Sequence, residues 1–490
     1  MIALLVTLIV PALGALAAAA MPARADRAAR ALAATAAGVA FLTSVLLLGW
    51  RTAGSPWVAV DVPWVPGLNL RFHIGVDGLS YPLVVLTTLL TLLCALYTCW
   101  RVPGPPGRGR HLAALLLVIE FGIVGVFLAL DLVLFFVFFE VVLLPMYAVI
   151  AVWGGARRRA AARKFVLYTL LGSLLLLVGV FTVVASAGTA DIVALTSTVT
   201  LPYHTQLAAF ILLAVAFAVK SPLWPLHSWL PDAHTEAPTV GSVILAGVLL
   251  KLGTYGLLRV AVGVAPAGAA AVSPYLGVLA VAAIGVGGLV CLAQTDLKRL
   301  IAYSSVGHMG FVLLGIATLT SIGFQAAVIG NIAHGIITGL LFFLAGAVKD
   351  RAHTGALGEL GRLREVAPGL SGLLGYAAIA SLGLPGLAGF WGEAFAVFAA
   401  FSRGGPLWIV LGCLAAVGAA LAAAYFLRML RQVTHGRPSP AVVSLSPPGL
   451  GAVELAAWAP LVVLALVLGL IPALVTALSA GPVQALVELR

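Results

Sequence analysis

Charged residues are scarce in this chain of 490 residues, where Asp, Glu, Lys and Arg together make up 9% and hydrophobic residues make up 62%. Soluble domains carry about 25% charged residues. A deficit of this size excludes a water-soluble globular fold. The composition instead predicts an all-α polytopic protein that crosses a membrane many times.

Cysteine is also scarce, and its spacing excludes several kinds of cofactor site. The four cysteines fall in apolar stretches without CxxC or CxxH spacing, so neither a disulfide framework nor an iron–sulfur or zinc site is indicated. No GxGxxG motif follows a strand, so no nucleotide-binding signature is present. The cysteines are Cys94, Cys99, Cys291 and Cys413. We therefore expect no cofactor and no metal in this chain.

The net charge is +11, with 27 basic and 16 acidic residues. This balance could indicate nucleic acid in another protein, but here the basic residues lie in short loops between apolar runs, where they set membrane topology. The apolar start of the chain resembles a signal peptide, yet no Lys or Arg precedes it, whereas Arg24, Arg27 and Arg30 follow it. This pattern predicts a retained first helix with its N-terminus outside.

Apolar runs of about 20 residues are long enough to cross a bilayer. Fourteen such runs are centred near residues 11, 40, 90, 121, 142, 175, 218, 250, 284, 312, 334, 385, 417 and 465. The loops that alternate to the inside hold twenty of the 27 basic residues, and those outside hold five. The outer five are Arg51, Arg71, Arg259, Arg403 and Arg490. The positive-inside rule then predicts fourteen spans with both termini outside.

Two spans contain helix breakers. The seventh includes Pro222 and Pro225, and the twelfth includes Pro385 between two glycines. Interior proline removes a backbone hydrogen bond, and such breaks lie where protein or a wet cavity satisfies the freed carbonyls. The breaks hold the fourth place in spans 4–8 and 9–13, which predicts two inverted five-helix repeats with an ion site near the midplane. The expected parts are helices 1–3 (1–110), the first repeat (111–262), the inverted second repeat (263–430), and a C-terminal loop with helix 14 (431–490).

Four ionisable residues lie inside or beside apolar runs: Glu140, Lys220, Lys251 and Glu393. At 1.5 Å per residue, Glu140 is roughly 12 Å from the outer end of its span and Lys251 roughly 16 Å from the inner end. An uncompensated charge near the bilayer centre costs about 2.5–3.5 kcal/mol. These groups could be structural ion pairs. Four of them, two beside broken helices, favour ion conduction, for which lysine is suited because it can release a proton where arginine cannot.

Three further residues are candidates for the same pathway. His308 in "SSVGHMGF" and His334 in "GNIAHGIIT" lie in adjacent spans, with Ser304, Ser305, Asn331 and Thr338 nearby. A lone buried histidine is usually a core residue, but this pair favours a proton relay. Glu120 in "LLLVIEFGIVG" is expected to assist near Glu140.

The segment "LHSWLPDAH" carries His227, Asp232 and His234, which could be metal ligands. The cluster crosses a proline-bounded helix end at the membrane surface. Capping and helix packing are therefore the preferred interpretation.

Long motifs in the chain resemble a known family. These are "FFEVVLLPMY", "KSPLWPLHSWLPDAHTEAPTVGSVILAGVLLK", "KRLIAYSSVGHMGF" and "LPGLAGFWGE". They are similar to the antiporter-like proton-pumping subunits of respiratory complex I, and most similar to the chain M (chain 4) type. The acid Glu393 in the twelfth span favours that type, because relatives of the L, N and Mrp types usually carry lysine there. The resemblance covers roughly residues 110–430.

The resemblance implies roles for the candidate residues. Glu140 would pair with Lys220 on the broken seventh span, Lys251 would be the central relay, and Glu393 would be the terminal group toward the exit. His308 and His334 would belong to a hydrated axis between them. The breaks at Pro222 and Pro385, with His227, Asp232 and His234, would support this arrangement.

The same resemblance implies a multi-pass subunit of a bacterial plasma-membrane NADH–quinone oxidoreductase. FMN, iron–sulfur clusters and quinone would then reside in partner subunits. The other antiporter-like chains L and N, small membrane chains and the peripheral arm would be partners, with no nucleic acid. Two alternatives stay open: a subunit of a Mrp-type cation/proton antiporter or of a membrane-bound hydrogenase, and a non-transporting membrane scaffold.

Overall fold

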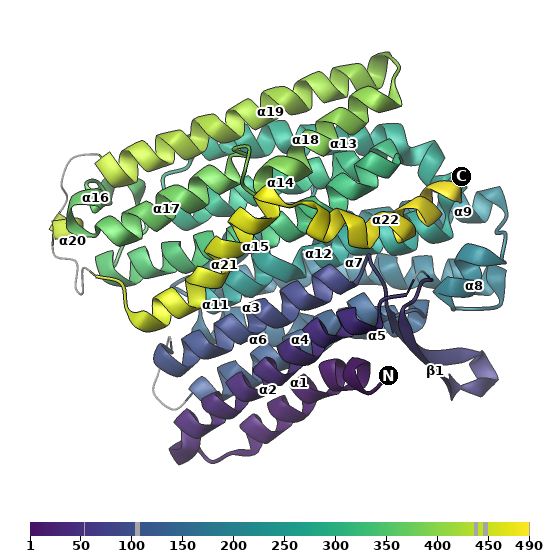
Figure 1. Cartoon of the computed structure of the whole chain (residues 1–490), viewed down its shortest axis with the longest axis horizontal. Coiled ribbons are helices and arrows are strands. Elements are labelled where there is room, and N and C mark those ends of the chain that lie inside the picture. Colours follow the sequence, from purple (N-terminus) through teal and green to yellow (C-terminus); the bar gives the residue numbers. More distant parts are fainter. Residues whose placement is uncertain (53, 103–107, 436–439, 444–448, 490) are drawn as a thin grey trace.

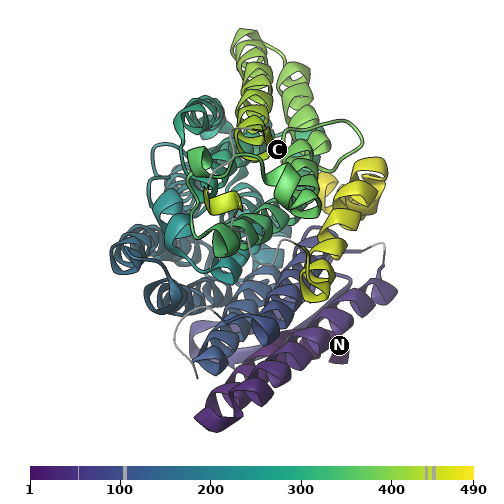
Figure 2. The ribbon, with the colours of Figure 1, turned by 90° about the vertical axis from the view of Figure 1, so that its left-hand side faces the viewer.

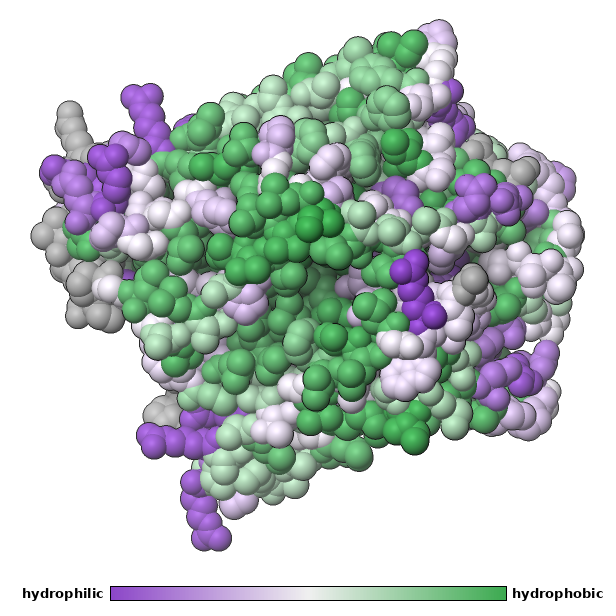
Figure 3. Space-filling view, viewed as in Figure 1, coloured by the Kyte–Doolittle hydropathy of each residue, from purple (hydrophilic) through white to green (hydrophobic). Residues whose placement is uncertain are grey.

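The computed structural model describes residues 1–52, 54–102, 108–435, 440–443 and 449–489. Arg437 and Arg490, which enter the charge count above, lie outside the described residues. Long helices lie side by side along one direction (Figure 1, Figure 2). Apolar side chains dominate the middle of the face shown in Figure 3, while hydrophilic ones gather at its two ends, as expected of a membrane protein.

The helices follow one another with short connections. The N-terminal part comprises α1 (Ile2–Ala20), α2 (Asp26–Leu46) and α3 (Tyr81–Trp100). The next part comprises α4 (Gly109–Leu128), α5 (Leu132–Val141), α6 (Leu143–Trp153), α7 (Arg158–Ala187), α8 (Ile192–Ser197), α9 (Tyr203–Lys220), α10 (Trp229–Glu236), α11 (Thr239–Ile244), the π-helical η4 (Leu245–Leu249), α12 (Lys251–Gly256) and the π-helical η5 (Leu257–Val262).

The second half of the chain has the same character. It comprises α13 (Pro266–Ala293), α14 (Leu297–Thr318), α15 (Ser321–Ala352), α16 (Leu363–Val366), α17 (Pro368–Ser381), α18 (Gly389–Arg403), α19 (Pro406–Leu430), the π-helical η7 (Arg431–His435), α20 (Pro440–Val443), α21 (Ala452–Leu470) and α22 (Ala473–Glu488).

Thirteen helical stretches of the described chain are long and apolar enough to cross a membrane. They match thirteen of the fourteen apolar runs. The remaining run is divided between α17 and α18, which have 14 and 15 residues and are each too short alone. The polytopic helical fold is therefore confirmed, while the boundaries of the two repeats stay a prediction.

Both expected helix breaks are present. Helix α9 ends at Lys220 and α10 begins at Trp229, with Pro222 between them. The Trp229 indole donates a hydrogen bond of 3.0 Å to the carbonyl of Val219 and so satisfies an acceptor at the end of α9. The second break separates α17 from α18 at Pro385, and the amide of Ala388 there donates to the carbonyl of Ala465 on α21 at 2.9 Å.

The structure contains a β-hairpin that was not predicted from the sequence. Strands β1 (Val58–Val65) and β2 (Leu70–Val76) pair antiparallel between α2 and α3. Residue Ile74 of β2 also forms a bridge with Ala129, at the end of α4. We call this end of the molecule the hairpin end. Figure 1 shows both chain termini toward it, in agreement with an even number of crossings.

The opposite end carries many basic side chains, and we call it the basic end. Ion pairs there join loops and helix ends from different parts of the chain. They are Arg30–Asp26 at 3.0 Å, Arg101–Asp350 at 3.2 Å, Lys164–Asp232 at 2.8 Å and Arg157–Glu236 at 3.7 Å. Arg259, which we placed in an outer segment, lies in η5 near the end of a span.

Helix α15 occupies the centre of the second half, with nearly all of its apolar stretch buried by other helices. Two glycines let its backbone approach neighbours closely. A Cβ at Gly335 would lie 2.5 Å from the carbonyl oxygen of Gly247 in η4, and a Cβ at Gly392 of α18 would lie 2.6 Å from the Cα of Gly330. These contacts bring His334 and Glu393, which directly precede or follow the glycines in the chain, into the interior between the helices.

Candidate proton pathway

Lys251 is fully buried where two π-helical segments flank α12. Its Nζ donates a hydrogen bond of 2.5 Å to the carbonyl of Ala246 and lies 2.6 Å from Nδ1 of His334 on α15. The wider turn of a π-helix leaves carbonyls accessible to side chains, and such turns are frequent at functional sites. The lysine is thus held between a backbone acceptor and an imidazole.

The approach of α15 to η4 at Gly335 and Gly247 explains this contact. Gly335 follows His334 and Gly247 follows Ala246, so the two partners of the Lys251 ammonium flank the point of closest backbone packing. A larger residue at either glycine would push the helices apart and lengthen the contact. The glycine pair was not recognised from the sequence.

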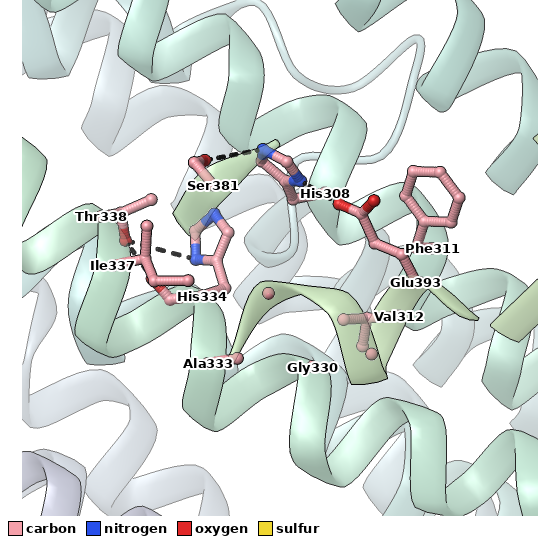
Figure 4. A pocket seen from close by; sticks show the side chains of 12 residues that line it. His308, Phe311, Val312, Gly330, Ala333, His334, Ile337, Thr338, Ser381 and Glu393 are labelled. Atoms are coloured by element: carbon pink, nitrogen blue, oxygen red, sulfur yellow. Dashed lines mark hydrogen bonds and ion pairs between the residues drawn. The ribbon is translucent and has the colours of Figure 1, made fainter. Parts of the chain in front are cut away.

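His334 faces His308 of α14 across a small cavity. The two ring centroids lie 5.9 Å apart, and His334 Nε2 has no hydrogen-bond partner among the described residues. Figure 4 shows this nitrogen directed toward His308 and Ser381. The cavity has a volume of about 30 Å³ and is lined by both histidines, Ser381 and Glu393. A water needs about 10–15 Å³ of such space, so this cavity, which both rings border, has room for a water.

His308 continues the series to Glu393. Its Nδ1 lies 2.8 Å from Oε1 of Glu393, the residue after Gly392 at the start of α18. Its Nε2 lies 3.1 Å from the hydroxyl of Ser381 at the end of α17 and 3.5 Å from that of Tyr425 on α19. Both termini of the broken helix therefore contact the same imidazole. Ser381 and Tyr425 were not identified from the sequence, since a serine at a helix end and a tyrosine in an apolar run give no distinctive pattern.

Lys251, His334, His308 and Glu393 therefore lie in one series, each side chain next to the following one. Thr338 adds a contact of 3.4 Å to His334 Nδ1, and Thr254 donates to Asn331 at 2.8 Å beside the lysine. Of the two serines noted near His308, each donates to the carbonyl of Ile301 within its own helix.

Glu140 and Lys220 belong to a separate part of the first half. Among the described residues no ion pair joins them directly. Lys220 is buried, and its Nζ lies 4.6 Å from the ring centroid of Phe139, the residue before Glu140. Glu140 is half-buried, its Oε1 lacks a hydrogen-bond partner, and it stands just before the interruption at Val142 that separates α5 from α6. An aromatic ring thus lies beside the expected pair.

Glu120 is fully buried on α4, and neither carboxylate oxygen has a hydrogen-bond partner in the described chain. A buried carboxyl group without a partner carries a large desolvation cost if it ionises, so a proton or water must accompany it. The structure does not join it to Glu140.

His227, Asp232 and His234 do not converge. Asp232 contacts Lys164 at 2.8 Å and Arg299 at 3.5 Å at the basic end. His234 is fully buried and stacks on Phe342 with centroids 4.5 Å apart. No group of three potential metal-ligating side chains occurs among the residues that the structure describes. The packing roles that we preferred agree with these contacts.

Comparisons with known proteins place this chain in a family. Residues 129–418 match the family described as NADH:quinone oxidoreductase/Mrp antiporter, TM. The chain is 40% identical, over 92% of its length and 88% of the relative, to NADH-quinone oxidoreductase subunit M of Rhodobacter capsulatus. It belongs to the complex I subunit M (chain 4) family. The subunit M of Rickettsia typhi is 36% identical over 88% of this chain and 86% of that relative.

Solved structures agree with this membership. A chain in respiratory complex I from Thermus thermophilus with bound NADH has a TM-score of 0.88 and 31% identity, covering 99% of both chains. A chain in the Mrp complex from Dietzia sp. DQ12-45-1b has a TM-score of 0.86 at 24% identity, covering 99% of this chain and 100% of that one, which shows a shared fold alone. As a subunit M family member, this chain is a multi-pass, antiporter-like membrane subunit of NADH-quinone oxidoreductase, part of respiratory complex I.

Proposed function

We propose that this subunit M carries protons through the membrane along the Lys251–His334–His308–Glu393 series. The observation that carries the proposal is the run of contacts from Lys251 Nζ to Glu393 Oε1. It has one gap, between the two imidazoles, and both rings border a cavity that has room for a water. A row of ionisable groups inside a membrane bundle marks an ion or proton pathway by default. Each member of this row can both accept and release a proton.

The direction of the hydrogen bonds supports a stepwise transfer. Because the Lys251 ammonium donates, His334 Nδ1 accepts, and in the neutral ring the proton is on Nε2, facing the cavity. Transfer to Nδ1 while Nε2 releases its proton passes one charge through the ring. His308 can repeat the step, receiving at Nε2 and donating from Nδ1 to Glu393.

We further propose that Glu140, Lys220 and Glu120 load this series. A change in a neighbouring subunit that moves Glu140 relative to Lys220 would alter the proton affinity of the lysine, because the two groups have opposite charge and lie in a poorly solvated interior. The Phe139 ring beside Lys220 stabilises the charged form of the lysine through a cation–π interaction when Glu140 is distant.

We also propose the wider setting, which the charge distribution and the family support. The basic end faces the inside of a bacterial plasma membrane and both termini face outside. The chain has the four parts 1–110, 111–262, 263–430 and 431–490, with broken helices at the fourth place of each repeat. Chains L and N and the small membrane chains are partners, while FMN, iron–sulfur clusters and quinone are held by other subunits, so redox energy reaches this chain mechanically.

The test is proton pumping by the whole complex in proteoliposomes that carry Lys251→Met or Glu393→Gln in this chain. Protons moved per NADH oxidised are expected to fall in both variants, with assembly retained. Lys164→Arg, a conservative change in a partly exposed ion pair at the basic end, serves as the control. Parental pumping in the two axis variants would reject the pathway and favour a scaffold role.

A further inference from the structure

A buried ion pair outside the pathway lies toward the hairpin end. Arg259 in η5 forms an ion pair with Asp77, which precedes α3. Asp77 is nearly fully buried, and it also accepts hydrogen bonds from the amides of Leu79 and Ser80 and from the hydroxyl of Ser55. Burial acts to raise the pKa of Asp77, but the Arg259 charge and these hydrogen bonds outweigh it and hold the pKa below its usual value. The carboxylate is therefore kept ionised.

Tyr255 connects this pair to the region of Lys251. The Arg259 Nε donates to the Tyr255 hydroxyl at 3.2 Å, and that hydroxyl donates to the carbonyl of Phe127 at 3.1 Å. Tyr255 stands four residues after Lys251 in α12, so it lies about 6 Å further along the helix axis toward the hairpin end. The polar groups thus continue beyond the lysine, away from the basic end.

On the other side, the pair borders a large vestibule of about 490 Å³. Asp77 and Arg259 line it, together with the exposed residues Arg51, Ser55 and Ser197. The C-terminal helix α22 closes one side through Ala477 and Leu486. A space of this size, bordered by exposed polar side chains, admits bulk water up to the ion pair.

We infer that the Asp77–Arg259 pair is the closed outer gate of a second proton route, which leads from Lys251 past Tyr255 to the vestibule at the hairpin end. This inference rests on the proposed function, since it assigns an outlet to the same lysine. It differs from the series through His334, His308 and Glu393, which runs across the second half of the chain.

The chemistry of the pair explains why it closes the route. Lysine, tyrosine, histidine and carboxyl groups can pass a proton on, whereas a guanidinium keeps its protons in proteins. A proton that reached Tyr255 would meet a fixed positive charge, and such a charge is a barrier to protons and cations in membrane pores. If Asp77 and Arg259 separate, the Asp77 carboxylate becomes a free acceptor at the wall of the vestibule and the route opens.

The test is passive proton leak in proteoliposomes that contain the intact complex, driven by a potassium diffusion potential without NADH. Arg259→Gln removes the positive charge and is expected to raise the leak severalfold, with NADH oxidation retained. Adding Lys251→Met to Arg259→Gln is expected to return the leak to the parental level, because the route begins at the lysine. Arg71→Gln, in the exposed pair with Asp61 at the same end, is the control and leaves the leak unchanged.

Arg259→Lys covers the case in which Arg259→Gln does not assemble, because it keeps the ion pair. An ammonium can release its proton, so this variant is expected to leak more as the pH rises. A parental, pH-independent leak in Arg259→Lys, or a leak in Arg259→Gln that survives Lys251→Met, would overturn the gate. If Lys251→Met stops pumping but the Arg259 variants leak no more than the parent, the gate inference is rejected and the proposed function stands. Normal pumping in Lys251→Met rejects the proposed function itself.

Discussion

The Nζ of Lys251 and the Nδ1 of His334 lie 2.6 Å apart, fully enclosed by helices from both halves of the chain. The ammonium has a second acceptor, the carbonyl of Ala246, so it is oriented from two sides. This arrangement holds the donor and the acceptor of the proposed transfer in contact before any proton moves, and the cost of ordering them is met during folding.

The first prediction concerns the ability of this lysine to release its proton. Lys251→Arg keeps the positive charge and can donate to the same two acceptors, but the guanidinium does not deprotonate. We expect proton pumping by the reconstituted complex to fall at least tenfold, measured as quenching of a pH-sensitive dye per NADH oxidised. Pumping at the parental rate would mean that Lys251 is only a structural cation.

The second prediction concerns the glycine contact that sets this distance. In Gly335→Ala the new Cβ would lie 2.5 Å from the Gly247 carbonyl oxygen and 2.6 Å from a methyl of Leu86. Overpacking of this kind costs about 1–3 kcal/mol, and separating α15 from η4 should also slow pumping. Thermal unfolding in detergent and pumping measure the two effects. Gly285→Ala on α13, where a Cβ meets nothing within 4 Å, should be neutral in both assays.

The membrane class, the spans and the breaks at Pro222 and Pro385 could be predicted from the sequence because they depend on local properties: apolar run length and proline. The ionisable residues of the pathway were visible for the same reason, since a charge inside an apolar run is conspicuous. Their order was available only through family resemblance, because contacts between α12, α14, α15 and α18 join residues that lie far apart in the chain.

The features that sequence reasoning missed have no local signature. Ser381 and Tyr425 become relevant only because α17 and α19 place them against His308. From the sequence we placed Arg259 in a loop, because it stands near the end of an apolar run. Its burial depends on its contact with Asp77, which is 182 residues away in the chain. The hairpin alternates poorly between polar and apolar residues, since most of β1 is exposed on both faces.

The third prediction concerns pH and the cap of α5. Asp131 accepts from the amides of Val133 and Leu134, while burial, followed by the nearby charge of Asp191, acts against its ionisation, and its pKa is raised above 3.8. A carboxyl whose folded pKa is raised contributes stability below its unfolded pKa and loses that contribution as the pH rises through the folded pKa. Asp131→Asn, an equally good N-cap, should therefore be more stable than the parent at pH 7, by roughly 0.5 kcal/mol, with no gain at low pH.

Thermal unfolding of the solubilised complex between pH 4 and pH 8 would measure this difference. Asp131→Ala, which removes the cap, should lose about 1 kcal/mol. A parent and an Asp131→Asn variant whose stabilities run parallel over the whole pH range would contradict the prediction.

The last prediction separates stability from transport at the basic end. Arg351 near the end of α15 and Glu454 near the start of α21 form a two-pronged ion pair, with N–O distances of 2.8 and 2.7 Å, and both side chains are buried. Glu454→Gln leaves the guanidinium without its counter-charge. Breaking a buried pair on one side in this way lowers the free energy of unfolding by about 3–5 kcal/mol. Asp350→Asn, in the partly exposed pair with Arg101, should cost about 0–1 kcal/mol. Because neither pair contacts the pathway, complexes that assemble with Glu454→Gln should still pump at the parental ratio of protons to NADH. A lowered ratio would show that the Arg351–Glu454 pair takes part in transport.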